Sequence, residues 1–348
     1  MGSVKDLIVI DPPKKNAGGR GRFCFSDRYS VFDWGEMPDL IPEKGKALCL
    51  ISAYFFERLE ELGIKTHYLG LIEDGEPKCL DELKTASHLM EVKLVRVLKP
   101  KVEDGRYDYS VYKAKKGNFL IPIEVIWRNL LGEGSSLIKR LKEGSINLKD
   151  LGLSTMPKEG EFFSPPVIEA STKLESSDRY ISWEEAKEIC GLTCEEKKGI
   201  KRLTMKVNEL ITQEVEPVGL VNCDGKIEFG FTRDRHLLLV DAVGTLDECR
   251  FTYSGLSVSK ELLRIFYRET DWFAEVEEVK KGGEINWKEC VKSTPPPLPE
   301  KLLSLISALY QASCNEITKR KWFDVPPFSQ IINEIQGYYD TQALANDK

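Results

Sequence analysis

The hydrophobic residues of this chain recur with two spacings, one typical of strands and one typical of helices. Residues 6–10, "DLIVI", predict a strand, and a basic Gly/Pro-marked loop, "DPPKKNAGGRGR", is expected to follow it. Short strand-like runs separated by charged turns fill residues 64–125. The apolar positions of the first predicted helix are Leu48, Ile51, Phe55, Leu59 and Leu62. Further helices are predicted around residues 200–211, 258–268 and 302–310. Because helices do not regularly separate the strands, the pattern predicts the α+β class with largely antiparallel pairing.

Two acids interrupt a predicted hairpin near residue 230. The runs Lys226–Thr232 and His236–Asp241 read as strands joined by a two-residue turn. Strand side chains alternate, so this register places Lys226 opposite Asp241, with Glu228 on the same face. The other face is expected to collect Ile227, Phe229, Phe231, Leu238 and Val240. Spacing alone leaves two interpretations open: a solvated face with a cross-strand ion pair, or a functional pair of carboxylates.

Composition excludes several classes of protein. The 348 residues are 41% hydrophobic and 30% charged, as in a globular protein, and the net charge of −6 gives no support to a nucleic-acid-binding role. No run approaches the roughly 18 apolar residues of a membrane helix, and no signal-peptide pattern opens the chain, so a cytoplasmic protein without membrane contact is expected. Nine cysteines without a C-x2-C pair argue against a disulfide framework or a zinc ribbon.

Two segments have the composition of phosphate-binding loops. In "GGRGR", Arg20 and Arg22 stand among glycines, which allow backbone N–H groups to approach an anion; a merely flexible loop is the alternative. In "WRNLLGEGSSLIKR", Arg128 precedes a Gly/Ser turn that opens a helix, where hydroxyls and free N–H groups favour a phosphate. The alternative there is a simple serine-capped helix start. Together with the two acids, which suit Mg²⁺, these loops predict a site for polyanions.

The order of several motifs resembles phosphoribosylaminoimidazole-succinocarboxamide synthase, the SAICAR synthetase family. The motifs are "SDRYSVFD", "PIEVIWRNLLGEGSSLIKRL", "STK", "KIEFGF", "LLLVDAVGTLDECRF" and "TPPPLPEKLLSLISALY". The resemblance runs from about residue 6 to about residue 320.

The resemblance implies an ATP- and Mg²⁺-dependent ligase that joins carboxyaminoimidazole ribotide to L-aspartate in purine biosynthesis. It also implies a small N-terminal, mostly antiparallel sheet domain that covers the nucleotide (1–125). A larger domain resembling the ATP-grasp proteins follows (126–323), and then a tail (324–348), whose end from 337 is expected to be frayed. Small-molecule substrates are the expected partners, and a homo-oligomer is left open.

Site residues are implied in the same way, position by position. Glu228 and Asp241 match the magnesium acids, and Lys226 matches the nucleotide-site lysine, so these three form the predicted catalytic set. Arg20 and Arg22, with Lys226 and Glu228, are the predicted ATP-binding residues. The predicted substrate-binding residues are Ser30, Asp33, Arg128, Ser135, Ser136, Lys173, Asp247 and Arg250.

The sequence also departs from the family pattern. The usual G-K-x-K/R reads "GRGR", the second acid of an Asp-Glu pair is Ala242, and a "GEHDE" segment is replaced by "ESSDRY", which leaves Asp178 as its acid. Two other hypotheses therefore stay open. One is a paralogous ATP-dependent carboxylate–amine ligase acting on a related nucleotide or imidazole, and the other is a nucleotide-binding protein that has lost catalysis.

Overall fold

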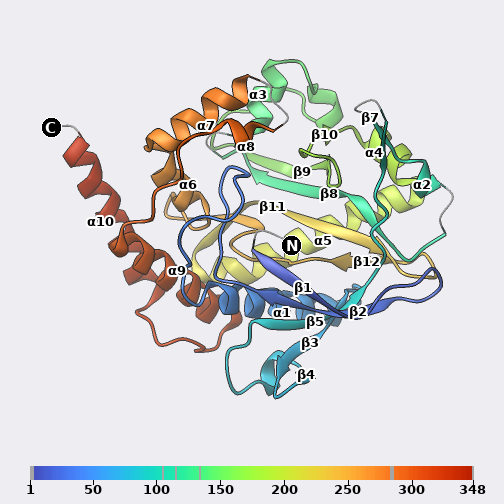
Figure 1. Ribbon diagram of the computed structural model, residues 1–348, viewed down its shortest axis with the longest axis horizontal. Coiled ribbons are helices and arrows are strands. Elements are labelled where there is room, and N and C mark those ends of the chain that lie inside the picture. The colour runs from blue at the N-terminus through green and yellow to red at the C-terminus, as the bar shows by residue number, and fades with distance from the viewer. Residues whose placement is uncertain (1–3, 104–105, 114–115, 133–134, 283–285, 347–348) are drawn as a thin grey trace.

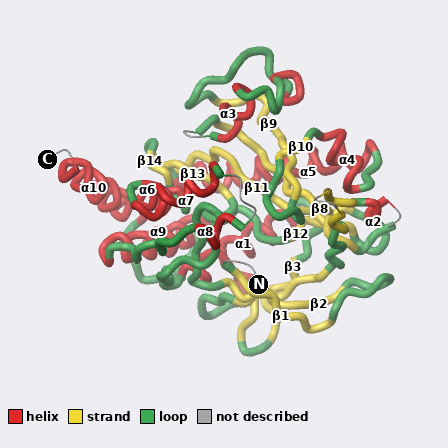
Figure 2. Tube along the Cα trace, turned by 45° about the horizontal axis from the view of Figure 1, so that its top comes forward, coloured by secondary structure: helices red, strands yellow, loops and turns green. Residues whose placement is uncertain are grey.

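The computed structural model describes residues 4–103, 106–113, 116–132, 135–282 and 286–346. It contains two main antiparallel sheets with helices packed around them (Figure 1), which confirms the predicted α+β class. In Figure 2 the strands β1 and β2 lie at one end of the molecule, and α3 lies at the opposite end.

The N-terminal sheet has the strand order β1-β2-β5-β3-β4, and each neighbouring pair is antiparallel. Its strands are β1 (Lys5–Asp11), β2 (Gly19–Phe25), β3 (Tyr68–Glu73), β4 (Glu76–Lys78) and β5 (Leu89–Leu94). The glycine-arginine segment predicted as a loop is therefore part of β2. The glycines are needed for close packing: a Cβ on Gly19 would lie 2.3 Å from the Asp11 carbonyl oxygen, and a Cβ on Gly21 would lie 2.8 Å from that of Ile8.

The larger sheet has the order β10-β9-β8-β11-β13-β14, and β12 also pairs with β11. Its strands are β8 (Phe119–Leu130), β9 (Phe162–Thr172), β10 (Tyr180–Ile181), β11 (Leu220–Phe231), β12 (Leu237–Val240), β13 (Cys249–Tyr253) and β14 (Leu256–Ser257). The first half of β11 pairs with β13 and its last residues pair with β12. A separate hairpin consists of β6 (Lys101–Glu103) and β7 (Arg106–Asp108). Strand β8 runs across position 125, and the division of the chain into domains stays a prediction.

The helices pack on the sheets, and the buried side chains of helices and strands together form the main hydrophobic core. They are α1 (Lys44–Glu61), α2 (Ser110–Lys113), α3 (Ser136–Lys142), α4 (Trp183–Cys190), α5 (Cys194–Val215), α6 (Glu261–Arg268), α7 (Asp271–Lys281), α8 (Trp287–Cys290), α9 (Glu300–Thr318) and α10 (Phe328–Asn346). Short 3-10 helices span Leu80–Glu82, Leu148–Leu151 and Glu216–Val218. Helix α1 packs on β2, β3, β5 and α9, while α5 packs on β8 and β11. The start of α5 is fixed by a capping box, in which Thr193 and Glu196 each accept the other's backbone N–H.

The prediction of a frayed tail is wrong. Residues 328–346 form α10, which packs on α9. The apolar residues that recur at helical spacing along α10 are buried, and they explain its order: Phe328, Ile331, Ile332, Ile335 and Tyr338.

The two sheets meet beside β12. The His67 N–H donates to the Leu239 carbonyl at 2.9 Å, and the Leu239 N–H donates to the Lys65 carbonyl at 2.9 Å. These bonds hold the segment that leads into β3 against β12. The N-terminal sheet is thereby fixed close to the hairpin that carries the predicted catalytic acids.

Candidate active site

The β11–β12 hairpin has a different register from the one predicted. Glu228 pairs with Val240, and Phe231 pairs with Leu237, so the connection is a five-residue loop rather than a two-residue turn. Arg235 in this loop has φ 62°, a left-handed conformation that the sequence pattern did not reveal. The shift of one residue moves the side chains of Leu238 and Val240 out of the main core and into a small cluster with Val95 and Leu120. Lys226 and Glu228 still share one face of β11, because alternation within a strand does not depend on its partner.

Asp241 lies just beyond the end of β12, in an unusual backbone conformation. Its φ of 71° is in the left-handed region, and its carbonyl accepts a hydrogen bond from Nε2 of buried His67 at 3.0 Å. Its carboxylate pairs with the Lys5 ammonium of β1 at 2.6 Å. Burial alone would raise the pKa of Asp241, but the charges of Lys5 and Lys173 hold it below its usual range, so this carboxylate is ionised.

Glu228 is buried in a cluster of charges on the same side of the sheet. Its carboxylate is paired with the Lys173 ammonium at the end of β9. Burial and the negative charge of Asp241 raise the pKa of Glu228, and Lys173 and Lys226 oppose the rise. The structure therefore brings the two predicted magnesium acids into one electrostatic group, together with Lys173.

Lys226 is held between two further acids. Its ammonium donates to Glu124 of β8 at 2.9 Å and lies 3.4 Å from Glu248. Burial would lower the pKa of Lys226, but Glu248 and Glu124 raise it well above its usual range, and the lysine is charged. A permanently charged ammonium in this position is suited to an anionic ligand.

A second cluster contains the two arginines predicted to hold a substrate phosphate. Arg250 of β13 makes a bidentate ion pair with Asp224, and Arg128 of β8 contacts the same carboxylate at 3.4 Å. Arg128 also pairs with Glu169 at 2.6 Å and donates to the Tyr180 hydroxyl at 3.0 Å. The Arg128 side chain is only 4% exposed, whereas that of Arg250 is 29% exposed. Arg250 is therefore the more accessible of the two to a ligand.

Several acids and bases of these clusters were missed by the sequence reasoning. Arg140 shares Glu169 with Arg128 at 2.7 Å and stacks on the Tyr180 ring at 3.6 Å. The other residues missed are Lys5, Glu124, Asp224, Glu169, Glu248 and Tyr180. Glu124 and Arg140 stand in segments that were recognised as motifs, so their position in the sequence could have indicated that they belong to the site. Lys5 stands just before the strand predicted at residues 6–10, and no pattern there indicated a role in the site.

Asp247 is not directed at an open site. Its carboxylate pairs with the fully buried Lys44 ammonium at 2.7 Å and accepts from the Tyr310 hydroxyl at 2.7 Å. Lys44 also donates to the Arg28 carbonyl at 3.2 Å. These contacts anchor the loop before β13 to α1 and α9, and they position Arg250 three residues later. A substrate contact by Asp247 stays a prediction.

The serine turn has the form of a helix cap. The Ser135 hydroxyl accepts from the Leu137 N–H at 3.3 Å, which is the structural alternative that the sequence offered, and Ser136 is the first residue of α3. Gly134, the turn residue before them, lies outside the described residues. The role of this turn in binding phosphate stays a prediction.

Asp33, which follows Ser30 in the predicted polar corner, lies near enough to Asp178 to affect its charge. Asp33 has φ 61°, and its charge contributes to the pKa of Asp178. That pKa is raised to about 6 by desolvation and by Glu124, with Lys226 opposing the rise. The structure thus brings Asp33 and Asp178 to the side of the site where Lys226 lies.

A model of the SAICAR synthetase family matches residues 2–279. An Archaeoglobus fulgidus protein, provisionally named a phosphoribosylaminoimidazole-succinocarboxamide synthase, is 52% identical over 336 residues, 97% of this chain and 99% of its own. The phosphoribosylaminoimidazole-succinocarboxamide synthase of Thermoplasma acidophilum is 34% identical over 328 residues, 92% of this chain and 98% of its own. The chain belongs to the SAICAR synthetase family. The predicted resemblance is confirmed, and the enzyme class of the family is that of a ligase.

Solved structures of the family share the fold. The SAICAR synthase of Saccharomyces cerevisiae complexed with SAICAR has a TM-score of 0.63 and 23% identity, and the match covers 93% of this chain and 95% of the yeast chain. A SAICAR synthetase in complex with ADP has a TM-score of 0.56 and 24% identity, with 86% and 99% covered.

The arginines expected to cover ATP in this SAICAR synthetase family member lie away from the catalytic cluster. Arg22 pairs with Glu91 at 2.9 Å and donates to the Gly75 carbonyl, and Arg20 pairs with Glu91 at 3.4 Å. By strand alternation both arginines are on the opposite face of the sheet from Lys5, which reaches Asp241. Their contact with ATP stays a prediction. Lys5 is a cation of this sheet that reaches Asp241.

Within the described ranges, no three or more His, Cys, Asp or Glu side chains are arranged to hold a metal ion. Glu228 and Asp241 provide two carboxylate groups, and carboxylate oxygens are the hard ligands that Mg²⁺ prefers. The negative charge of Asp241 raises the pKa of Glu228, so a bound cation would favour the ionised form of Glu228.

No helix in the described part of the chain is long and apolar enough to cross a membrane.

Proposed function

We propose that this member of the SAICAR synthetase family is an ATP-dependent ligase that joins carboxyaminoimidazole ribotide to L-aspartate. One observation carries the proposal: the cluster of Lys173, Lys226, Glu228 and Asp241 lies on the same sheet as the arginine pair Arg128 and Arg250. A nucleotide and a second phosphate-bearing substrate both need such cationic groups. The match to the family model over residues 2–279, and a relative 52% identical over 97% of the chain, support the same function.

The first chemical step is activation of a carboxylate, which is a poor acyl donor. An oxygen of the ribotide carboxylate attacks the γ-phosphorus of ATP, the bond from that phosphorus to the β,γ-bridging oxygen breaks, and ADP leaves. Lys226 and Lys173 are charged at neutral pH and would neutralise the transferring phosphoryl group. No covalent side-chain nucleophile is required.

The second step forms the amide. The neutral amine of aspartate attacks the acyl carbon, the carbon–oxygen bond to phosphate breaks, and the nitrogen loses a proton. Asp178 is suited to accept that proton, because its pKa of about 6 is close to neutral and its neighbours include Lys226 and Asp33. The remaining catalytic effect comes from positioning the amine beside the acyl phosphate.

Glu228 and Asp241 would hold Mg²⁺ in this scheme. When bound, the ion supplies positive charge to the phosphate oxygens of the nucleotide. The pair fits this role because Glu228 is buried, Asp241 is half-buried and so open to a ligand, and the charge of Asp241 already raises the pKa of Glu228. Lys5 pairs with Asp241 and Lys173 pairs with Glu228, so each carboxylate would have to bind both its lysine and the metal ion.

Arg250, assisted by Arg128, would hold the ribotide phosphate. Both guanidinium groups are fixed by Asp224, and a planar guanidinium matches two phosphate oxygens. The partial exposure of Arg250 leaves part of its donor set to a ligand.

The decisive experiment is a panel of amino acids assayed with carboxyaminoimidazole ribotide, ATP and Mg²⁺, with the amide product and ADP measured together. We expect amide only with an acidic amino acid, and mainly with L-aspartate, because cations built to pair a side-chain carboxylate are left unpaired by a neutral amino acid. Efficient amide formation with a neutral amino acid, or none with aspartate, would favour the paralogous ligase. ATP binding without any amide would favour a protein that has lost catalysis.

A further inference from the structure

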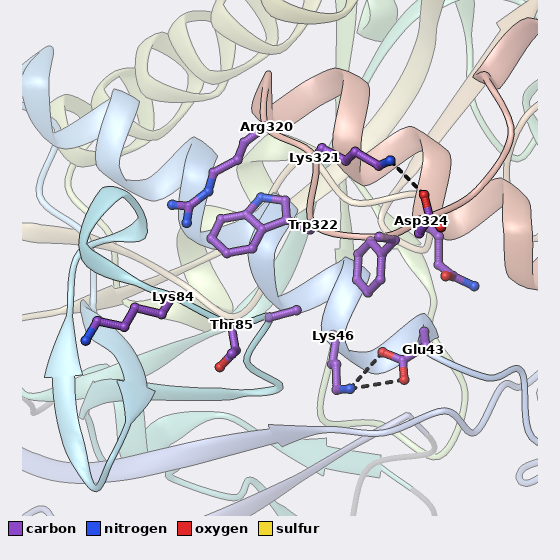
Figure 3. Close-up of a pocket in the computed structure, with 11 residues that line it drawn as sticks. Glu43, Lys46, Lys84, Thr85, Arg320, Lys321, Trp322 and Asp324 are labelled. Atoms are coloured by element: carbon purple, nitrogen blue, oxygen red, sulfur yellow. Dashed lines mark hydrogen bonds and ion pairs between the residues drawn. The ribbon is translucent and has the colours of Figure 1, made fainter.

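A polar hollow lies on the surface between α1, the segment after the first 3-10 helix, and the end of α9. Its volume is about 520 Å³, which is within the range of small-molecule sites. Figure 3 shows Trp322 on one wall, Lys84 and Thr85 on a second, and Lys46 with Glu43 on a third. None of the residues that line it belongs to the two charged clusters of the active site. The lining residues are Glu43, Lys46, Lys84, Thr85, Ala86, Gln311, Arg320, Lys321, Trp322, Phe323 and Asp324.

The hollow carries more positive than negative charge. Lys46 pairs with Glu43 at 2.8 Å, and Lys321 pairs with Asp324 at 2.7 Å, so these four charges cancel in two pairs.

Two cations are left without acidic partners among the described residues. The Arg320 guanidinium donates to the backbone carbonyls of Leu80 and Leu83 at 3.2 and 2.6 Å, and these neutral acceptors leave its charge uncompensated. The Lys84 ammonium makes no hydrogen bond or ion pair within the described residues. Two uncompensated positive charges therefore line this hollow, although the whole chain has a net charge of −6. A phosphate monoester, with a charge of about −1.5 to −2 at neutral pH, matches this surplus.

An aromatic wall stands beside the charges and is held in place. The Arg320 guanidinium stacks on the Trp322 ring at 3.9 Å. The Trp322 indole N–H donates to the Thr318 hydroxyl at 3.0 Å, and its backbone N–H donates to the Asn315 side-chain oxygen at 2.7 Å. Trp322 remains half-buried, so part of its ring faces solvent in the hollow, while neighbouring Phe323 is buried. A fixed indole is a stacking surface for a flat aromatic ring.

From this combination we infer that the hollow is a binding site for a nucleoside 5′-monophosphate, separate from the active site. The base stacks against Trp322, and the phosphate lies near Lys84 and Arg320. Thr85 and Gln311 add hydrogen-bonding groups on the wall. The inference rests on the charge surplus and the aromatic wall, and it does not depend on the proposed ligase activity.

The test is calorimetric titration of the full chain with AMP, in the presence of Mg²⁺ and a saturating non-hydrolysable ATP analogue that occupies the catalytic nucleotide site. One AMP per chain is expected to bind. Lys84→Glu and Trp322→Leu should each weaken AMP at least tenfold. Lys198→Glu, the same charge reversal at an exposed lysine of α5 that does not line the hollow, is the control and should leave the affinity unchanged.

Two further measurements separate this site from the catalytic one. Adenosine and inorganic phosphate, titrated singly, should each bind more weakly than AMP, because each satisfies one half of the site. Lys84→Glu should retain the amide-forming activity of the unmodified chain. AMP binding that is equal in Lys84→Glu and in the control, or absent altogether, would overturn the inference. So would a loss of activity in Lys84→Glu with an intact fold, because the hollow would then belong to the active site.

Discussion

Replacing Asp241 with asparagine tests the core of the proposed site. The change keeps the size of the side chain and removes one negative charge from a group that includes Lys5 and Glu228. One of the two magnesium donors is thereby weakened, and the Lys5 ammonium loses its ion-pair partner at 2.6 Å. The lost charge stabilisation should lower kcat by on the order of 10²-fold, equivalent to about 2.7 kcal/mol. The half-saturating Mg²⁺ concentration should rise by about tenfold, because a neutral amide oxygen is a weaker ligand than a carboxylate.

The assay is a magnesium titration of turnover at saturating ATP, ribotide and aspartate, with ADP and amide followed together. Asp234→Asn is the matched control, since Asp234 is an exposed acid in the loop of the same hairpin and pairs with neighbouring Arg233. The control should keep normal kcat and normal magnesium dependence. Circular dichroism should show that both variants fold. Near-normal turnover of Asp241→Asn at saturating Mg²⁺ would refute the metal assignment.

Three further predictions follow from particular contacts. Arg250→Lys should raise the ribotide KM about tenfold or more and leave the ATP KM nearly unchanged, because lysine cannot offer a planar pair of donors; equal rises in both constants would indicate a purely structural pair with Asp224. His67 is buried with its pKa lowered to about 4, so the unfolded state binds more protons between pH 6.5 and 4, and about 3 kcal/mol of folding stability should be lost as the pH falls through that window. Urea unfolding at several pH values measures this loss, and it should disappear in a His67→Gln chain that still folds. Ile335→Ala should cost about 2–5 kcal/mol of unfolding free energy, whereas an unaltered denaturation midpoint would show that α10 does not contribute to the folded core.

Local patterns predicted α1, α5, α6 and α9, but they missed α10 and gave the wrong hairpin register. The apolar spacing around Phe55 marks α1 because a helix needs only residues three and four positions apart to define its buried face. The hairpin depends instead on its loop, where Arg235 adopts a left-handed conformation that its residue type does not announce. A one-residue error there assigns Leu238 and Val240 to the wrong face, although Lys226 and Glu228 stay on one side by alternation alone.

Spacing alone predicted only the site residues that stand in one hairpin, whereas Lys173, Arg128 and Arg250 were implied by the resemblance to the family. Glu228 and Asp241 belong to one hairpin, so spacing could suggest that they meet. Lys5 reaches Asp241 from a strand more than two hundred positions earlier, and no local pattern records that contact. The pairing of Asp247 with buried Lys44 was likewise not predictable, because Lys44 stands about two hundred positions earlier, and the predicted substrate contact of Asp247 stays a prediction.

Because Asp224 pairs with both Arg128 and Arg250, these two side chains should lose little conformational entropy when a phosphate binds. A free arginine on a surface samples many rotamers, and ordering such a side chain on binding costs about 0.5–1.5 kcal/mol. Here Arg250 is restrained by a bidentate pair and Arg128 by Asp224 and Glu169, so that ordering takes place when the chain folds. An arriving phosphate then meets guanidinium groups that are already oriented. Asp224 and Glu169 also compete with the phosphate for the guanidinium N–H groups. This competition favours ligands that bind the N–H groups not used by these acids, and it allows more weakly bound anions to dissociate quickly.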